Sequence, residues 1–378
     1  MKKLTDICDI QYGYAFDSKC FTEDPSYPAL VRIRDVKRGY SETYYSGDYP
    51  KEYVLSAGDL LVGMDGEFNI ARWKCDGALL NQRVCKLSAK EGTNEEYLRF
   101  AMSKALKEIE QRTAFVTVKH LSAKELNKLE LAVPETSEQD KIADMLTKLE
   151  CIIGARQQEL QKLDELIKAR FVEMFGDMFL NSMDWPEDRL DSLADIVSGI
   201  TKGRKIKETE LIEVPYMAVS NVKDGYIDWT TVKTIAATKS EIEQYRLKPK
   251  DVLMTEVGDP DKLGRGAIIQ TPPENCIHQN HIFRVRLDRE RLLPEYMSQY
   301  LQHQRAKRYF LGCAKQTTGI ASINMKQLKA LPILIPPMQK QKEFSAFLEQ
   351  VDKSKVAVQA ALDKAQLLFD SLMQEYFG

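Results

Sequence analysis

At residues 331–341 the chain reads LPILIPPMQKQ, and at residues 129–139 it reads LELAVPETSEQ. In each stretch a short apolar run of strand length ends at a proline, Pro134 or Pro336, and a glutamine follows five residues later. Proline interrupts a strand ladder and is tolerated in the first turn of a helix. Each stretch therefore predicts a final strand that gives way to a helix, and the same junction occurs twice.

Both junctions are followed by apolar side chains that recur every seven residues. A seven-residue repeat sustained over several turns places these side chains on one seam of a helix, which is typical of a coiled coil. The predicted interface residues are Ile142, Leu146, Leu149, Ile153, Leu160, Leu163 and Ile167 in the first helix, and Phe344, Leu348, Val351, Val358, Leu362, Phe369 and Leu372 in the second.

Two arrangements of these helices fit the pattern. Each helix could pack only on the core of its own domain, or the two could pair in antiparallel directions and hold the domains apart. The first helix would rise about 50 Å at 1.5 Å per residue, more than one small domain needs, and this favours pairing. Arg156 and Lys355 fall on the seam, where a cation needs a partner, and Glu159 and Asp352 are placed to supply one.

The segments that precede the two helices resemble each other in the same order along the chain. Gly13 matches Gly199, and NQRV at 81–84 matches QNHI at 279–282. Further matched segments are 35–40 with 221–226, 58–62 with 250–254, and 96–98 with 295–297. The offset grows along the chain, as expected when loops lengthen while a framework is kept. We infer an internal duplication.

Each half has the pattern of a mixed α/β domain. Short apolar runs separated by Gly, Pro, Asp and Asn predict several short strands, and helical stretches follow at 94–111 and 294–309. The predicted fold is therefore mixed α/β, with two similar domains separated by two long antiparallel coiled-coil helices in a pseudo-twofold repeat. The expected segments are domain 1–137, helix 138–176, connector 177–184, domain 185–337 and helix 338–378.

Two domains of one design, each closing with proline, glutamine and a long helix, resemble the specificity subunits of type I restriction-modification systems over nearly the whole chain. In that family the junction reads approximately IPLPPxxEQ. Here Glu135 stands in place of the second proline in the first copy, and Lys340 stands where the family tends to have glutamate in the second. The GDLL box at 58–61 is also similar to the family, while Lys250 replaces its glycine in the second half.

The resemblance implies a function without catalysis by this chain. Each domain would be a target recognition domain that reads one half of a bipartite, asymmetric site in double-stranded DNA. The helices would set the spacer and dock two modification (methyltransferase) subunits, and restriction (translocase and endonuclease) subunits would join them. No cofactor is expected in this chain, whereas the partner subunits are expected to use S-adenosylmethionine, ATP and Mg. The expected location is the cytoplasm.

Base reading requires side chains with hydrogen-bonding groups on exposed loops, and basic or hydroxyl groups that hold phosphates. The candidates in the first domain are Tyr12, Tyr14, Arg32, Arg34, Arg72, Lys74, Lys119 and His120. The candidates in the second domain are Lys202, Arg204, Lys205, Lys262, Arg265, Lys315, Gln316, Thr317 and Thr318. The predicted loop 314–319 combines a cation, an amide and two hydroxyls. Each candidate could equally be an ordinary solvated residue.

Composition and missing motifs narrow the alternatives. The net charge of −2 does not mark a nucleic-acid binder, and no apolar run is long enough to cross a membrane. The seven cysteines include no C-x-x-C pair, and Cys276-x-His278-x-x-His281 lacks a fourth ligand and fits a strand instead of a metal site. No phosphate-binding loop or methyltransferase motif is present, which counts against an autonomous DNA nuclease or methyltransferase. A coiled-coil scaffold that binds other proteins is the remaining alternative.

Overall fold

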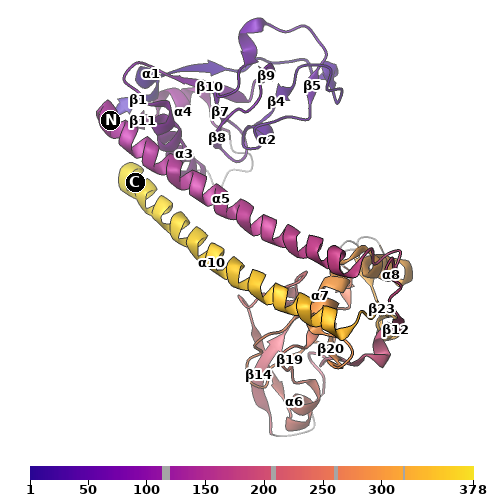
Figure 1. Cartoon of the computed structure of the whole chain (residues 1–378). Coiled ribbons are helices and arrows are strands. Elements are labelled where there is room, and N and C mark those ends of the chain that lie inside the picture. Colours follow the sequence, from indigo (N-terminus) through magenta and orange to yellow (C-terminus); the bar gives the residue numbers. More distant parts are fainter. Residues whose placement is uncertain (113–119, 206–209, 259–262, 318–319) are drawn as a thin grey trace. The chain divides into compact units, whose positions relative to one another are not determined.

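The computed structural model describes residues 1–112, 120–205, 210–258, 263–317 and 320–378, with the backbone alone for residues 316, 317 and 320. The chain divides into two compact units, Met1–Gln158 with Gln359–Gly378, and Glu159–Val358. Each unit contains one globular domain and a part of each long helix (Figure 1). The mixed α/β class and the duplicated design are confirmed.

The first domain is built on a four-stranded antiparallel sheet in the order β2-β10-β7-β8. Its strands are β2 (Cys8–Tyr12), β10 (Val84–Ala89), β7 (Leu60–Gly63) and β8 (Asn69–Arg72). Leu60 and Val62 lie in the same core cluster as the helix α3 (Glu95–Arg112), while Leu61 joins a second cluster on the other face. Both faces of β7 are therefore buried, which explains its unbroken apolar sequence.

The second domain repeats this sheet in the order β13-β20-β16-β18. Its strands are β13 (Ala194–Ser198), β20 (Ile282–Leu287), β16 (Val252–Thr255) and β18 (Gly266–Ile268). The register also corresponds, because Leu60 pairs with Leu87 and Val252 pairs with Val285. The helices α7 (Pro294–Gln302) and α8 (Gln304–Cys313) follow the sheet. The single helical stretch expected at 294–309 is therefore wrong, since the backbone becomes extended at His303.

Smaller elements complete each domain. The first contains β1 (Lys2–Lys3), α1 (Leu4–Ile7), β3 (Phe21–Thr22), β4 (Leu30–Val31), α2 (Ile33–Val36), β5 (Tyr44–Tyr45), β6 (Val54–Leu55), β9 (Ala78–Leu80), α4 (Ala123–Lys128) and β11 (Glu130–Leu131). The second contains β12 (Glu187–Arg189), β14 (Ile212–Met217), β15 (Lys233–Ala237), α6 (Lys239–Tyr245), β17 (Val257–Gly258), β19 (Ile277–His278), β21 (Lys315–Thr317), β22 (Ile320–Ser322), α9 (Met325–Lys329) and β23 (Pro332–Leu334). The parallel pair β4–β9 corresponds to β14–β19, but the third strand of this sheet lies beside β9 in one domain and beside β14 in the other.

The two long helices are α5 (Thr136–Phe175) and α10 (Met338–Phe377), each of 40 residues (Figure 1). In the second unit the late part of α5 packs on the early part of α10, with the Phe344 ring centroid 5.4 Å from those of Phe171 and Phe175. In the first unit the opposite parts meet, because Leu149 and Leu368 line one pocket. Both units therefore show antiparallel pairing.

Every residue of the predicted seam is buried or half-buried along both helices. Ile142 and Leu146 also join the core of the first domain, so α5 packs on its own domain as well as on α10. Lys355 forms an ion pair with Asp164, a partner that the sequence analysis did not name. Within the described ranges no helix is both long enough and apolar enough to span a bilayer.

Candidate nucleic-acid interface

Three segments distant in sequence meet at the carboxyl end of β7. The Met64 N–H donates to the Arg83 carbonyl over 3.0 Å, and the Leu121 N–H donates to the Met64 carbonyl over 2.7 Å. We name residues 63–66, 81–83 and 120–121 the first tip. These backbone contacts join the end of a strand, a turn between two strands and the segment before α4.

The second domain builds the same junction at the end of β16. The Glu256 N–H donates to the His281 carbonyl, and the Ile323 N–H donates to the Glu256 carbonyl, both over 3.0 Å. We name residues 255–258, 279–281 and 320–323 the second tip. The backbone pattern of the two tips is shared, whereas their side chains differ.

The matched glycines hold the turn of each tip in place. A Cβ on Gly13 would lie 2.1 Å from the Asn81 carbonyl oxygen, and a Cβ on Gly199 would lie 2.0 Å from the His278 carbonyl oxygen. Neither contact is sterically possible for another residue without backbone movement. Glycine is therefore required at both positions because two backbone segments approach closely there.

Each tip carries an exposed nitrogen-bearing side chain held by a carboxylate. In the first tip Asp65 is 7% exposed and contacts both Arg83 and His120, whose side chains are 55% and 57% exposed. In the second tip Nδ1 of His281 lies 2.7 Å from the Glu256 carboxylate. The carboxylates restrict the orientation of groups that reach into solvent.

Several predicted residues of the first domain lie at or near the first tip. His120 belongs to it, and exposed Tyr14 forms a β-bridge with Asn81. Arg32 and Arg34 lie at the start of α2, which packs on β7, and both approach the buried Asp35 carboxylate, Arg32 at 3.7 Å and Arg34 at 3.8 Å. Burial is the main cause that raises the pKa of Asp35.

The other predicted residues of the first domain lie elsewhere. The Tyr12 hydroxyl donates to Asn127 Oδ1 over 2.7 Å, and burial raises the pKa of Tyr12 to about 12. Lys74 lies two residues after the carboxyl end of β8, whereas Asn69 at the other end is the residue near the first tip. The Lys74 ammonium donates to the Arg38 carbonyl over 3.3 Å. Lys119 lies outside the described residues.

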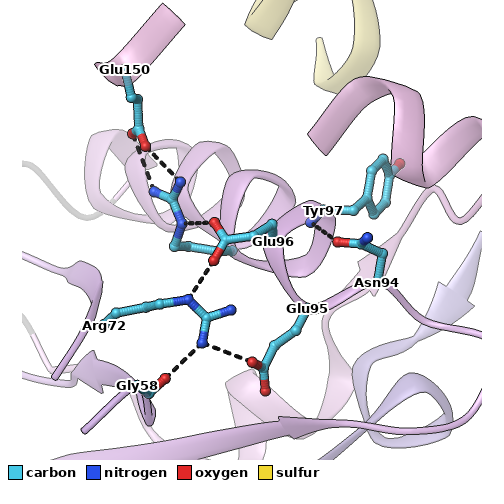
Figure 2. Close-up of polar contacts among 8 residues, drawn as sticks. Gly58, Arg72, Asn94, Glu95, Glu96, Tyr97 and Glu150 are labelled. Carbon is cyan, nitrogen blue, oxygen red and sulfur yellow. Dashed lines mark hydrogen bonds and ion pairs between the residues drawn. The ribbon is translucent and has the colours of Figure 1, made fainter. Parts of the chain in front are cut away.

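Arg72 is held in a polar network between the sheet, α3 and α5 (Figure 2). Its guanidinium donates to the Gly58 carbonyl over 2.6 Å, to Glu95 over 2.8 Å, and to Glu96. Burial acts to raise the pKa of Glu96, but hydrogen bonds from Arg99 and Arg72 outweigh it and lower that pKa. Arg99 also binds both oxygens of Glu150 on α5, at 3.1 and 2.6 Å. This network joins the first domain to the long helix.

The second domain brings together a different subset of the predicted residues. The Arg265 carbonyl accepts from Thr255 at the second tip, where Asn69 holds the corresponding place in the first domain. Exposed Lys315 begins β21, which pairs with β22. The predicted loop is therefore wrong at 315–317, because pairing with β22 makes this segment a strand. The predicted residues Gln316 and Thr317 belong to this strand.

The remaining predicted residues of the second domain follow Ile200, which forms a β-bridge with Gln279. Lys202 and Lys205 are exposed. Arg204 is bound to both oxygens of Glu241 at 2.5 and 2.6 Å, and these bonds raise the pKa of Arg204. Lys262 and Thr318 lie outside the described residues.

The model of the type I restriction modification DNA specificity domain matches residues 1–165 and again residues 183–365. The chain belongs to this family. It is a DNA-sequence specificity subunit of a type I restriction-modification system, as the resemblance implied.

Two relatives of this chain are specificity subunits of type I restriction enzymes. It is 27% identical to the type I restriction enzyme EcoBI specificity subunit of Escherichia coli, over 99% of this chain and 84% of the relative. It is 21% identical to the EcoKI specificity subunit of Escherichia coli K12, over 71% of this chain and 61% of that one.

Solved structures share the fold. An S subunit of a type I restriction-modification system from M. genitalium has a TM-score of 0.60 at 14% identity, covering 100% of this chain and 95% of that one. A chain from a structure on complex assembly and conformational transition of the type I R-M system has a TM-score of 0.56 at 17% identity, covering 100% and 96%.

Sequence reasoning named none of four tip residues of this specificity subunit as a DNA contact: Asp65, Arg83, Glu256 and His281. A signal was available, because the matched turns 81–84 and 279–282 place Arg83 opposite His281. The carboxylates give no such signal. Asp65 belongs to a Gly-rich turn, and Glu256, which has the same role in the second tip, matches Met64 and not Asp65 in the repeat.

Proposed function

We propose that the two globular domains are target recognition domains, each reading one tract of a bipartite, asymmetric site in double-stranded DNA. The observation that carries this proposal is the tip, which is built twice on one backbone pattern with different side chains. A shared framework presents each set of groups in the same way, while the differing groups recognise different bases. The two tracts are therefore unlike in sequence.

The DNA contacts include the predicted residues that the fold leaves exposed or half-buried near the tips. In the first domain these are Tyr14, Arg32, Arg34 and His120, and in the second Lys202, Lys205, Arg265 and Lys315. Arg72 and Arg204 are bound by glutamates of their own domains, so their contribution is to hold the fold. Cations near phosphates fix position, and hydrogen-bonding groups at base edges supply specificity.

We assign the paired helices two roles. A continuous helix of 40 residues has a fixed rise, so α5 and α10 determine the length of unread DNA between the tracts. Their outer faces carry exposed apolar side chains, among them Val356 and Leu367, which suit the docking of two modification subunits. One of the solved relatives is described in terms of complex assembly of a type I R-M system, which supports this role.

Chemistry is assigned to the partners. The modification subunits would methylate adenine with S-adenosylmethionine, and the restriction subunits would use ATP and Mg for translocation and cleavage. This chain alone would neither methylate nor cut DNA. Because the whole complex would act on the cell's own DNA and on incoming DNA, we place it in the cytoplasm.

The test is binding of the full chain to duplexes in which both tracts and the spacer are randomised, followed by sequencing of the bound fraction. We expect two short fixed tracts at one spacing, with affinity that falls steeply as salt rises because phosphate contacts release counterions. Duplexes with only one tract should bind much more weakly, since linked sites gain effective concentration.

A protein-binding scaffold would enrich no DNA sequence in this experiment. An autonomous enzyme would methylate or cleave the duplexes when S-adenosylmethionine, ATP and Mg are supplied without partner subunits. Either result would contradict the proposal.

A further inference from the structure

Arg83 and His281 occupy the same place in the two tips. The carbonyl of each accepts the N–H of the residue that follows the buried strand, from Met64 in one domain and from Glu256 in the other, over 3.0 Å in both. Both side chains are about half exposed, Arg83 at 55% and His281 at 48%. The duplication has therefore kept the position of an exposed nitrogen-bearing side chain while changing its chemistry.

The guanidinium of Arg83 is held along one edge only. Its Nη1 atom contacts Oδ2 of Asp65, whose other oxygen contacts His120. The Nε–Nη2 edge has no partner in the part of the chain that the structure describes. Two parallel N–H donors in a fixed fork match the O6 and N7 acceptors that guanine presents in the major groove.

Asp65 contributes by fixing the direction of this fork. Its carboxylate is almost fully buried two residues after β7, and Asp65 forms a β-bridge with His120, so the fold fixes its position. An arginine held in one orientation before binding loses less side-chain freedom when it meets its ligand. Asp65 is therefore a positioning residue for Arg83.

The second tip presents a different group at this place. Nδ1 of His281 lies 2.7 Å from Oε2 of Glu256, and its Nε2 lies 3.3 Å from Nδ2 of Asn280. The imidazole has one outward ring nitrogen and no fork, so it cannot form the paired hydrogen bonds of arginine with guanine.

We propose that Arg83 and His281 are corresponding base-reading residues, and that Arg83 selects a guanine within the tract of the first domain. This inference rests on the proposed function and deepens it by naming one specificity-determining position in each domain. It follows that the two tracts differ in the base read at this position.

The test compares wild type with Arg83→Gln and Arg83→Lys in the full chain, using the randomised duplexes described above. We expect wild type to require guanine at one position of one tract. Both variants should reduce that preference about tenfold to a hundredfold, because a good bidentate contact carries that much discrimination. Preferences at the other positions should remain. Asp65→Asn should weaken the same preference, and His281→Arg should change one position of the other tract.

Arg189→Gln is the matched control, since Arg189 is also an exposed arginine held by a carboxylate but lies in β12, away from the second tip. It should leave every base preference unchanged. Unchanged preference in both Arg83 variants would overturn the inference, as would an affinity loss that is uniform over all sequences and so indicates a phosphate contact. Failure of wild type to select any bipartite sequence would instead contradict the proposed function itself.

Discussion

Gln139 and Gln341 make the same three hydrogen bonds in the two halves of the molecule. Gln139 accepts from the Asn94 N–H over 2.9 Å and donates to the carbonyls of Gly92 and Pro134 over 3.1 and 2.8 Å. Gln341 accepts from the Leu293 N–H over 2.9 Å and donates to the carbonyls of Arg291 and Pro336 over 3.2 and 2.8 Å. Each glutamine thus ties the first turn of a long helix to the segment that leads into the helix of its domain.

Loss of this glutamine should be costly. Both side chains are 1% exposed or less, so Gln139→Ala or Gln341→Ala leaves one N–H and two carbonyls without their partner in a buried place. We expect the free energy of unfolding to fall by about 2–4 kcal/mol in each variant, measured by urea denaturation. Gln161→Ala on the exposed surface of α5 is the control. Equal denaturation midpoints for Gln139→Ala and the control would rule out this role.

At position 250, glycine should give a more stable variant than alanine. It has a φ of 73° where the matched Gly58 has 96°, and its ammonium lies 2.7 Å from Glu295. Both variants lose the ion pair, but only glycine removes the backbone strain. Lys250→Gly should therefore be more stable than Lys250→Ala by about 1 kcal/mol.

The neighbouring Lys248 provides the reference for this comparison, because it is not among the residues with positive φ. There alanine should be the more stable of the two substitutions. Thermal denaturation of the four variants gives both differences. If glycine were the less stable choice at both positions, the strain at Lys250 would be disproved.

Arg99 and Glu150 should be energetically coupled. Two hydrogen bonds join the Arg99 side chain, 14% exposed, to the carboxylate on α5, 41% exposed. A double-mutant cycle with alanine should give a coupling of about 1 kcal/mol, because solvent screens the outer partner. The cycle for Arg170 and Glu173, a more exposed pair within α5, should give less than about 0.5 kcal/mol. Equal couplings would show that Glu150 does not fasten the domain to the helix.

The second domain should lose stability as the pH falls from 6.5 towards 4. His278 is fully buried between the carbonyls of Tyr245 and Val197, and burial lowers its pKa to about 4. Between the unfolded pKa of 6.5 and the folded value the unfolded chain binds more protons, so acid favours unfolding. The loss should approach about 3 kcal/mol at the lower end of this window. His278→Gln should flatten the dependence, and an unchanged slope in the variant would assign it to other groups.

Lengthening both helices should change the spacer and leave the tracts alone. Insertion of one heptad at matched seam positions in α5 and α10 keeps the apolar stripe continuous and adds about 10 Å of rise. We expect the selected spacer to lengthen by about three base pairs at 3.4 Å each. An insertion of the same length in the loop at residues 46–50 is the control and should leave the spacer unchanged. Altered base preference with an unchanged spacer would contradict the role of the helices.

The long helices were predictable because their order is local. The seven-residue repeat specifies the buried face whatever the helix packs against, and Pro134 and Pro336 mark where each helix begins. The break at His303 could not be predicted, because neighbouring Gln302 and Gln304 are good helix formers and no glycine or proline interrupts the pattern.

The tips and the strand β21 beside the second tip were not predictable from local sequence. Lys315–Thr317 lacks apolar alternation and becomes a strand only because β22 lies beside it. The carboxylates Asp65 and Glu256 meet their partners across a fold built from three distant segments, whereas in the sequence Asp65 has the pattern of a turn residue. Only the internal duplication, by placing Arg83 opposite His281, indicates where to look.

The short strand pairs β1–β11 and β12–β23 bring the first and last strands of each recognition domain into direct contact. The chain therefore enters and leaves each recognition domain at neighbouring positions. Such a domain can be replaced by another of similar design through two adjacent junctions, while the long helices stay unchanged. Exchange of a whole recognition domain would then change one half of the sequence preference in a single step.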